Sequence, residues 1–446
     1  MKKVLVLGAG LSTPYLIKYL LEKHAGETIV LDRDYRLAKS RIGGHLRGRA
    51  VEVSITRPSV LEPYIREADV VVSMLPAFMH ADVIKLAIKY RKPVVTASYI
   101  KGEIKELGEE ARKAGVPVIG ECGADPGIDH AMAKRKIDQL RSKGYKIKKV
   151  RTAAGALVHP DYLKDNPWKY KFTWAPRNVV MAGRSTTAYI SNHKLRLLPY
   201  PKPFDDIRQM HNPITGTMEA YPNSDSSRYL DWYGFSDINE LWRGSIRYPG
   251  FISSWRLIAM SGITDPFLFV PEVVKTYRQL MSSLLGTDDV EGKLRQMGAT
   301  PEDIYRIKWL GLLDEILLIA HRKSPTVPDV FESLLRQKWK LNPKDKDMVI
   351  IQEEIEYETT KGKKMLWKGS MYHVGEDAQN TAIAFTVGIP VAIITRLLVE
   401  GKLKLDGGLY IPVIPEIYNP LLDELQELGL IFNEEELSIE EEVNVS

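Results

Sequence analysis

The chain has 446 residues, of which 44% are hydrophobic and 27% are charged, and its formal net charge is +5 at pH 7. This balance is typical of a soluble globular protein and excludes a largely disordered chain, and the length predicts two or three domains. The modest positive charge is spread along the chain, so the composition does not indicate nucleic-acid binding.

Membrane and metal sites are also not indicated by the sequence. No apolar run approaches the roughly 18 to 20 residues of a spanning helix, and the N-terminus lacks the pattern of a signal peptide. The single cysteine, Cys122, excludes an intramolecular disulfide and a multi-cysteine metal site. We therefore expect a cytoplasmic protein with no membrane contact and no bound metal. The acidic stretch 434–446 is expected to be a solvated tail.

The N-terminal part alternates strand-like and helical patterns. Residues 2–7 form an unbroken apolar run, as expected for a strand buried on both faces of a parallel sheet. Helical patterns such as 83–89 and 103–114 separate the later strands. This alternation predicts a doubly wound parallel sheet of the Rossmann type. The further strand-like runs are 28–31, 50–55, 69–74, 93–97 and 116–119.

A glycine-containing turn follows the first predicted strand and opens a helix. Gly8 and Gly10 match the first two glycines of the dinucleotide fingerprint GxGxxG, which make the tight turn and admit a pyrophosphate. The pyrophosphate then lies at the positive end of the helix, near Leu11 and Ser12. Thr13 stands in place of the third glycine, whose role is close helix packing. The turn therefore predicts dinucleotide binding.

Two charged neighbours at the end of the second predicted strand bear on the choice of cofactor. Asp32 has the position at which an acid binds the ribose 2′-hydroxyl of NAD. Arg33 is suited to the 2′-phosphate of NADP, although an arginine that stacks on adenine or faces solvent is an equal alternative. Because a carboxylate repels a phosphate, these residues favour NAD over NADP.

Polar residues also follow the fourth and fifth predicted strands. Leu75 and Pro76 end the fourth, and Ala97, Ser98 and Tyr99 end the fifth. Open sheets bind ligands at the carboxyl ends of their strands. Ser98 and Tyr99 are thus candidates to bind cofactor or substrate, with simple strand closure as the alternative.

The stretch 118–130, VIGECGADPGIDH, ends the sixth predicted strand in a turn that carries an acid. Asp125 lies between Ala124 and Pro126, in a sequence suited to a fixed turn. We expect Asp125 to project towards the junction with the second half of the chain. Asp129 and His130 begin a helix, so we expect a structural role for Asp129 and local hydrogen bonding for His130.

The second half of the chain has a different pattern of predicted helices, strands and loops. A helix at 130–140 and a strand at 146–152 precede a long loop rich in aromatic residues. The pattern at 252–341 is helical, clearest at 277–285 and 301–319. Residues 348–357 and 364–372 predict a two-stranded ribbon that turns at Gly362, and 381–399 predicts a long apolar helix.

Two basic clusters in this half are interleaved with aromatic residues. Lys169, Lys171 and Arg177 belong to the first, and Arg243 and Arg247 to the second. The planar guanidinium group of an arginine can bind a carboxylate through two parallel hydrogen bonds. The clusters therefore favour an anion-binding pocket over a set of solvated basic side chains.

Seven motifs together resemble the saccharopine dehydrogenase family of the glutamate-forming type, also called saccharopine reductase. The resemblance covers most of the chain. The motifs are GAGLST at 8–13, TASYI at 96–100, ADPGIDH at 124–130, DNPWKYKFTWAPRNV at 165–179, YPNSDS at 221–226, RGSIRYPGF at 243–251 and TVGIPVAI at 386–393.

The resemblance implies three domains, of which the central one mediates dimer contacts, and so a homodimer. We place a dinucleotide-binding Rossmann domain at 1–125, with 402–446 packing back on it. A central α/β domain then comprises 126–251 and 345–401, with an inserted helical subdomain at 252–344.

The resemblance also implies a reaction. In this family saccharopine is oxidised at its secondary amine to an imine, which water splits into glutamate and 2-aminoadipate 6-semialdehyde; in reverse, an imine is reduced by hydride. Ser98 and Asp125 match substrate-contacting positions and Arg247 a carboxylate-binding one. Asp125 is then expected to orient the amine, either as the proton acceptor or as an electrostatic anchor while water carries the proton.

The expected site residues form two overlapping sets. The substrate-binding set is Ser98, Tyr99, Asp125, Arg177, Ser224 and Arg247, with Asp125 as the catalytic residue. The cofactor-binding set is Gly8, Gly10, Leu11, Ser12, Thr13, Asp32, Arg33, Leu75, Pro76, Ala97, Ser98, Ala124, Asp125, Pro126 and Ala175.

Two departures from the family pattern leave alternatives open. Ser224 stands where the family motif YPNRD carries an arginine for a substrate carboxylate. Another amine is therefore an alternative substrate, as in carboxynorspermidine dehydrogenase or lysine 6-dehydrogenase. Asp32 precedes the arginine position of a family that is typically NADP-linked, so NAD and NADP both remain. A nucleotide-binding sensor or scaffold without catalysis is the alternative from another class.

Overall fold

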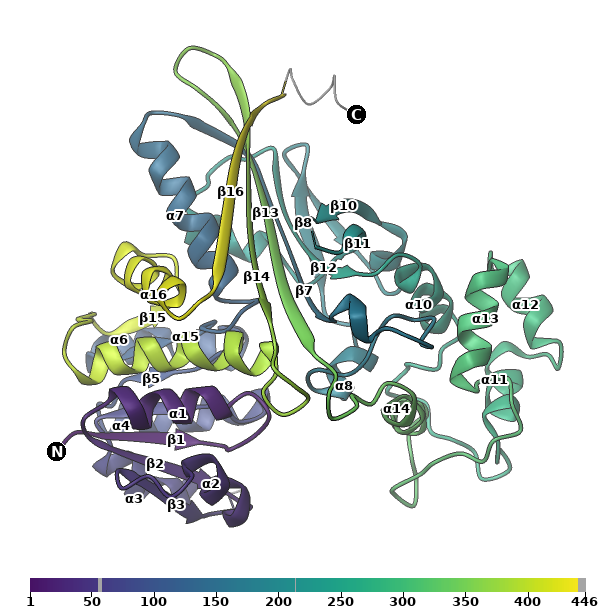
Figure 1. Cartoon of the computed structure of the whole chain (residues 1–446), viewed down its shortest axis with the longest axis horizontal. Helices are drawn as coiled ribbons and strands as arrows, with labels where there is room; N and C mark the ends of the chain where they lie inside the picture. The colour runs from purple at the N-terminus through teal and green to yellow at the C-terminus, as the bar shows by residue number, and fades with distance from the viewer. Residues whose placement is uncertain (55–57, 213, 440–446) are drawn as a thin grey trace. The chain divides into compact units, whose positions relative to one another are not determined.

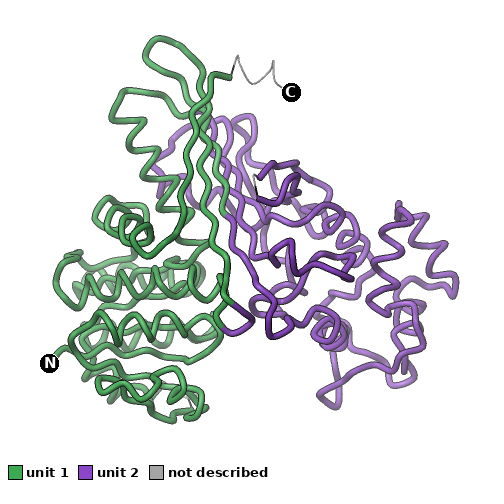
Figure 2. The backbone as a smooth tube through the Cα atoms, viewed as in Figure 1, with its two compact units in different colours: residues 1–147, 351–376, 380–446 green, residues 148–350, 377–379 purple. Residues whose placement is uncertain are grey.

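The structure is a computed structural model that describes residues 1–54, 58–212 and 214–439. The chain forms two compact units (Figure 2). Unit 1 comprises 1–147, 351–376 and the residues from 380 onward, and unit 2 comprises 148–350 and 377–379. The chain passes between them inside β7 (Lys146–Val158) and β13 (Asp347–Glu358). The three-domain division inferred above is not tested by these units and stays a prediction.

Unit 1 contains a parallel sheet whose described strands run in the order β15-β6-β5-β4-β1-β2-β3 (Figure 1). The central strands are buried, since all four residues of β4 and the last four of β1 are inaccessible. The predicted doubly wound sheet is confirmed, and six strands match predicted runs. Ile55, the end of the third predicted run, lies outside the described residues. The strands are β1 Lys3–Leu7, β2 Glu27–Asp32, β3 Gly48–Glu52, β4 Val70–Ser73, β5 Val94–Val95, β6 Pro117–Ile119 and β15 Gly408–Tyr410.

The strand order reverses between β1 and β4, which both pair with their neighbours in parallel. Ligands of open sheets bind outside the carboxyl ends of the strands at such a point. The helices that connect and flank these strands are α1 Pro14–Lys23, α2 Tyr35–Ile42, α3 Pro58–Glu67, α4 His80–Lys89, α5 Glu103–Glu106, α6 Gly108–Ala114, α7 Ile128–Ser142, α15 Ala382–Val399 and α16 Pro415–Glu427, with a short 3-10 turn, η1 Ala77–Met79.

Helix α15 overturns the expectation that no apolar run approaches membrane-spanning length. It has 18 residues with a mean hydropathy of 2.1, but 78% of it is buried inside the structure. It packs against α1 on one side of the parallel sheet (Figure 1). A helix that is apolar all round and buried in this way is typical of a protein core, so we interpret α15 as the core helix of unit 1.

The predicted two-stranded ribbon is present and has an additional partner. β13 and β14 (Lys364–Val374) are joined by the predicted turn, in which Gly362 N–H donates to Thr359 O. β16 (Ile431–Ser438) pairs with β14 in antiparallel register. The expectation of a solvated tail is therefore wrong for 434–438, while 440–446 lie outside the described residues. Lys136 Nζ lies 2.8 Å from the carboxylate of Glu436, which explains how an acidic strand is held in place.

Unit 2 contains its own strands. β12 (Glu240–Arg247) lies between β7, to which it is parallel, and the antiparallel β11 (Gly216–Pro222). β10 (Arg208–Asn212) pairs with β11, and β8 (Thr187–Ser191) pairs with both β12 and β9 (Lys194–Leu198). The predicted strand at 146–152 is the first part of β7.

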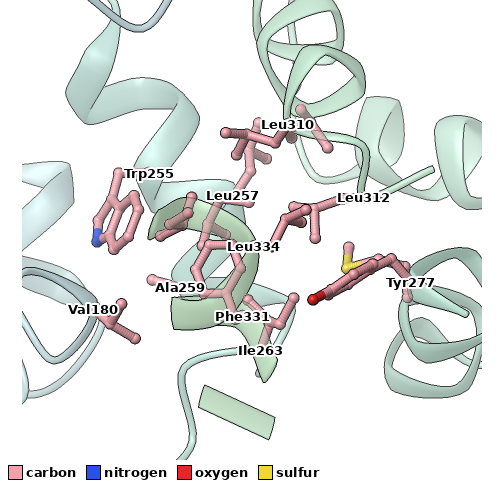
Figure 3. Close-up of a cluster of buried hydrophobic side chains, with 14 of the residues drawn as sticks. Val180, Trp255, Leu257, Ala259, Ile263, Tyr277, Leu310, Leu312, Phe331 and Leu334 are labelled. Atoms are coloured by element: carbon pink, nitrogen blue, oxygen red, sulfur yellow. The ribbon is translucent and has the colours of Figure 1, made fainter. Parts of the chain in front are cut away.

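The helical part of unit 2 packs around a large hydrophobic cluster that includes Trp255, Tyr277, Phe331 and Leu334 (Figure 3). The helix predicted at 301–319 ends at Leu310, because Gly311 adopts a left-handed backbone with φ of 91°. The helices are α8 Pro176–Val180, α9 Leu230–Tyr233, α10 Phe251–Met260, α11 Tyr277–Leu285, α12 Val290–Gln296, α13 Pro301–Leu310 and α14 Val327–Lys338, with 3-10 turns η2 Pro160–Tyr162, η3 Lys202–Asp205 and η4 Ser227–Tyr229.

Candidate functional site

The glycine turn between β1 and α1 has the shape that a dinucleotide requires. Gly8 has a φ of 100°, and a Cβ there would lie 3.0 Å from the carbonyl oxygen of Met74. Gly10 faces open space, since a Cβ there would meet no atom within 4 Å. The open space beside Gly10, at the N-terminus of the ten-residue helix α1, therefore leaves room for a pyrophosphate against the backbone. Leu11 is also exposed beside it.

The role of the missing third glycine falls to another helix. Thr13 is buried, and its hydroxyl donates to the carbonyl of Gly10. A Cβ on Gly388 of α15 would lie 2.8 Å from the carbonyl of Ser12 and 3.2 Å from the amide of Leu16. The close approach to α1 is therefore made by a glycine of α15, a contact that the N-terminal sequence alone does not reveal.

Asp32 supports the glycine turn from the end of β2. One carboxylate oxygen accepts a hydrogen bond from Ala9 N–H at 2.7 Å, and the other accepts from Asp34 N–H at 2.9 Å. Arg33 is exposed. The carboxylate that was expected to bind a ribose hydroxyl is thus already engaged with the backbone, while Arg33 points its charge to solvent.

The ends of β4 and β5 carry the next group of expected residues. Leu75 approaches the glycine turn, since its Cδ2 would lie 3.6 Å from a Cβ on Gly8. Ser98 N–H donates to Thr96 Oγ1 at 3.2 Å, and Ser98 Oγ lies 2.7 Å from Nε2 of His80. His80 is buried at the start of α4 and also lies 2.8 Å from Ser73 Oγ. No motif or spacing in the sequence marks His80 as a residue of the site.

The turn that carries Asp125 is held by its own backbone. Gly123 N–H donates to Pro126 O at 2.9 Å, and Ile128 N–H donates to Gly123 O at 2.9 Å. A Cβ on Gly127 would lie 2.0 Å from Gly123 O, so this position requires glycine. Asp125 is half-buried on the turn.

Neighbouring side chains connect the Asp125 turn to the end of β5. Asp129 Oδ1 accepts from Gly127 N–H at 2.6 Å and from His130 N–H at 2.8 Å, which confirms its expected structural role. His130 Nε2 lies 3.2 Å from the buried carboxylate of Glu121, as expected for a locally bonded histidine. Glu121 N–H in turn donates to Ser98 O at 2.9 Å. Cys122 is buried.

Within unit 2, Arg247 is the expected residue with the most distinctive surroundings. It is only 5% exposed, at the end of β12. Its guanidinium lies 5.4 to 5.8 Å from the ring centroids of Tyr170, Tyr221 and Phe251. Nη1 donates to Ile246 O at 2.7 Å, and Nε is buried without a hydrogen-bond partner. None of the described residues forms an ion pair with it, so this buried cation suits an anionic ligand.

Three of the other basic residues of the two clusters have partners, and the fourth, Lys169, is exposed. Lys171 Nζ lies 2.6 Å from a carboxylate oxygen of Asp345, and both side chains are buried. Arg177 Nη1 lies 3.1 Å from Asp329. Arg243 is buried with its guanidinium 4.7 Å from the ring of Tyr229. Lys171 and Arg177 thus already have carboxylate partners, and the anion-binding pocket, with a substrate contact by Arg177, remains a prediction.

Ser224 and Ala175 occupy special backbone positions in unit 2. Ser224 has a positive φ of 50°, and its hydroxyl donates to Asn223 Oδ1 at 3.4 Å. Ala175 is the N-cap of α8, where its carbonyl accepts from Asn178 N–H. Neither position is tested as a ligand contact, and both remain predictions.

The expected residues therefore fall into two groups. Those from Gly8 to Pro126 lie in unit 1, where the sheet and the Asp125 turn bring them towards the same strand ends. Ala175, Arg177, Ser224 and Arg247 lie in unit 2. The role of Asp125 as a residue shared by both halves of the chain stays a prediction.

Family comparisons match nearly the whole chain. The saccharopine dehydrogenase NADP binding domain matches residues 4–119, and the saccharopine dehydrogenase C-terminal domain matches 123–430. The chain belongs to the saccharopine dehydrogenase family. The resemblance drawn from the seven motifs is confirmed, and the two family models meet just before the Asp125 turn.

Individual relatives agree with this assignment. The chain is 30% identical to alpha-aminoadipic semialdehyde synthase of Rattus norvegicus, over 97% of this chain and 47% of that protein. It thus spans about half the length of that relative. It is 28% identical to saccharopine dehydrogenase [NADP(+), L-glutamate-forming] of Saccharomyces cerevisiae, over 96% of this chain and 97% of that one.

Solved structures show the same fold. The apo saccharopine dehydrogenase (L-Glu forming) of Saccharomyces cerevisiae superposes with a TM-score of 0.87 at 27% identity, covering 98% of this chain and 100% of that chain. The homospermidine synthase of Legionella pneumophila superposes with a TM-score of 0.57 at 10% identity, covering 97% and 91%, and supports the fold alone. The predicted architecture is confirmed, and this saccharopine dehydrogenase family member contains a domain of the nicotinamide-nucleotide-binding type.

Proposed function

We propose that the chain is an oxidoreductase that interconverts saccharopine with glutamate and 2-aminoadipate 6-semialdehyde. This proposal rests mainly on the surroundings of Arg247. Its guanidinium is buried among aromatic rings and has no ion pair among the described residues, which suits a ligand with carboxylates. Membership of the saccharopine dehydrogenase family supports the reaction type. In the oxidative direction, saccharopine, water and the oxidised cofactor yield glutamate, the semialdehyde, the reduced cofactor and a proton.

The chain's own residues prepare the amine for this chemistry. The bound nicotinamide nucleotide supplies the hydride acceptor or donor. Asp125, on a turn fixed by Gly123 and Gly127, orients the secondary amine and stabilises its positive charge or accepts its proton. Arg247 binds a carboxylate on an arm of the substrate. Water then completes the cleavage of the carbon–nitrogen bond after oxidation to the imine.

A comparison of three amines tests the proposed substrate. Ser224 replaces the arginine of the family motif, so saccharopine, carboxynorspermidine and lysine are the relevant choices. We expect saccharopine to give the highest kcat/KM, measured by the absorbance of the reduced cofactor. Faster oxidation of either other amine would contradict the proposed substrate. If no amine were oxidised and no imine were reduced in the reverse direction, the result would favour a nucleotide-binding protein without catalysis.

For the cofactor we propose NADP. Both carboxylate oxygens of Asp32 already accept backbone hydrogen bonds, so they are less available to a ribose hydroxyl, and Arg33 is exposed beside them. The name of the matched family domain also favours NADP. This replaces the preference for NAD inferred from sequence. Assembly as a homodimer and a cytoplasmic location are further proposals, which rest on the family resemblance and on composition.

Replacing Arg33 tests the cofactor assignment. Loss of an arginine–phosphate contact is expected to weaken NADPH binding about 10- to 100-fold in Arg33→Ala. NADH binding is expected to change by less than about twofold, since NADH lacks the 2′-phosphate. Dissociation constants from fluorescence titration, with turnover of saccharopine followed in parallel, measure both. Arg49→Ala is the matched control, because Arg49 already pairs with Glu27 at 3.0 Å. Tighter binding of NADH than NADPH by the unmodified chain would contradict the proposal.

A further inference from the structure

A chain of hydrogen bonds links the end of β4, the start of α4 and the end of β5 in unit 1. Ser73 Oγ lies 2.8 Å from Nδ1 of His80, and Nε2 of His80 lies 2.7 Å from Ser98 Oγ. Ser73 and His80 are each 1% exposed, whereas Ser98 is half-buried. The imidazole therefore connects a fully buried hydroxyl to one at the edge of the candidate site.

The direction of these hydrogen bonds follows from Ser73. Its hydroxyl has no partner among the described residues other than Nδ1 of His80. If Nδ1 carried the proton, the Ser73 hydroxyl proton would be buried without an acceptor, which is costly. Ser73 therefore donates to Nδ1, and the proton of the neutral imidazole is on Nε2.

This tautomer determines what Ser98 can do. The Nε2–H of His80 donates to Ser98 Oγ, so the Ser98 hydroxyl proton is not used by His80. Among the described residues, Ser98 Oγ has no other hydrogen-bond partner. A hydroxyl that already accepts one hydrogen bond is a better donor in the next, because hydrogen bonds in a chain polarise one another. Ser98 thus offers a donor to an external oxygen atom.

The imidazole is neutral over the working range of pH. Burial lowers the pKa of His80 to about 4. His80 is also the first residue of α4, where the positive end of the helix dipole disfavours a second proton. A neutral ring keeps one nitrogen as acceptor and the other as donor, which the directed chain requires.

We propose that His80 is a positioning residue, which together with Ser73 fixes the Ser98 hydroxyl as a hydrogen-bond donor to a carboxylate oxygen of the substrate. This rests on the proposed function, because the contact between Ser98 and substrate is itself part of it. The opposite tautomer would make Ser98 an acceptor suited to an ammonium group. A purely structural His80 would only tie α4 to the two strand ends.

Two substitutions of His80 separate these roles. The amide nitrogen of glutamine can take the place of Nε2, whereas the amide of asparagine reaches only the place of Nδ1. In His80→Gln we expect the KM for saccharopine to stay within about threefold. In His80→Asn and Ser98→Ala we expect it to rise about tenfold or more, as for the loss of a hydrogen bond to a charged group, with a smaller change in kcat. The double variant Ser98→Ala/His80→Asn should be no worse than Ser98→Ala alone.

Thermal unfolding and the dissociation constant of NADPH, measured on the same variants, complete the kinetic test. Equal KM values for His80→Asn and His80→Gln in folded protein would overturn the positioning role. So would additive effects in the double variant. A change confined to the NADPH dissociation constant would overturn the assignment of the substrate as the acceptor.

A second measurement does not depend on turnover. In the whole chain labelled with 15N in its histidine rings, NMR should show His80 with a protonated Nε2 and an unprotonated Nδ1, assigned by the signal lost in His80→Asn. A protonated Nδ1 would overturn the proposal even if saccharopine is turned over. Absence of saccharopine turnover in the unmodified chain, with the expected tautomer present, would instead count against the proposed function and in favour of the hydrogen-bonded chain.

Discussion

Asp125→Asn is expected to lower the turnover of saccharopine by about 10²- to 10⁴-fold, the usual contribution of a positioned acid or base. Asparagine has the same shape as aspartate but carries no charge and does not accept a proton. The turn itself should persist, because it is closed by the backbone hydrogen bonds between Gly123 and Pro126 and between Gly123 and Ile128. Steady-state kinetics with saccharopine and cofactor titration measure the two effects.

The affinity for the cofactor should therefore be nearly unchanged in Asp125→Asn. Asp129→Asn is the matched comparison, because the Asp129 carboxylate accepts two backbone hydrogen bonds in the same turn. That variant should lower the midpoint of thermal unfolding, whereas Asp125→Asn should leave it within a few degrees. Unchanged turnover in Asp125→Asn would remove Asp125 from the mechanism.

Arg247→Met is expected to raise the KM for saccharopine by about 10- to 100-fold, or about 1.4–2.8 kcal/mol, as for the loss of hydrogen bonds to a charged group. Methionine keeps an apolar side chain beside Tyr170, Tyr221 and Phe251 but removes the cation. The kcat should change less, because the contact with a remote carboxylate is present in the ground state as well as in the transition state.

The control for Arg247 is an arginine in similar surroundings that already has a carboxylate. Arg208 lies 4.3 Å from the ring of Trp242 and pairs with Glu240 at 2.7 Å. Arg208→Met should leave the KM unchanged within about twofold, since the half-buried Arg208 guanidinium already pairs with a carboxylate. An equal rise in both variants would indicate a general loss of packing, and no rise in Arg247→Met would exclude Arg247 as the carboxylate site.

Much of unit 1 follows from local sequence. The apolar runs of β1, β2 and β4 are buried on both faces, and the glycine turn after β1 needs Gly8 for its backbone angle. These features depend on residues that are close together in the chain. For the same reason the Asp125 turn was recognised from its aspartate, proline and glycine.

Other features depend on partners that are far apart in the chain. Gly388 of α15 takes over the packing role of the missing third glycine, nearly 380 residues after the fingerprint. The acidic segment before Ser438 becomes a strand because β14 offers it a backbone partner and Lys136 a positive charge. Composition alone predicted a solvated tail, since it contains no information on which distant strand edge is available.

The sequence by itself determined the type of sheet, the position of the cofactor turn and the family, because these are written in short motifs and in apolar periodicity. Only the tertiary structure decided which charged and polar groups already have partners. Lys171 and Arg177 are paired with Asp345 and Asp329, whereas Arg247 has no ion pair among the described residues. Likewise, Ser73, His80 and Ser98 become one hydrogen-bonded chain only when three strand and helix ends meet. Hydrogen bonds and ion pairs are satisfied in space rather than along the chain, so the chemistry of the site depends on the fold.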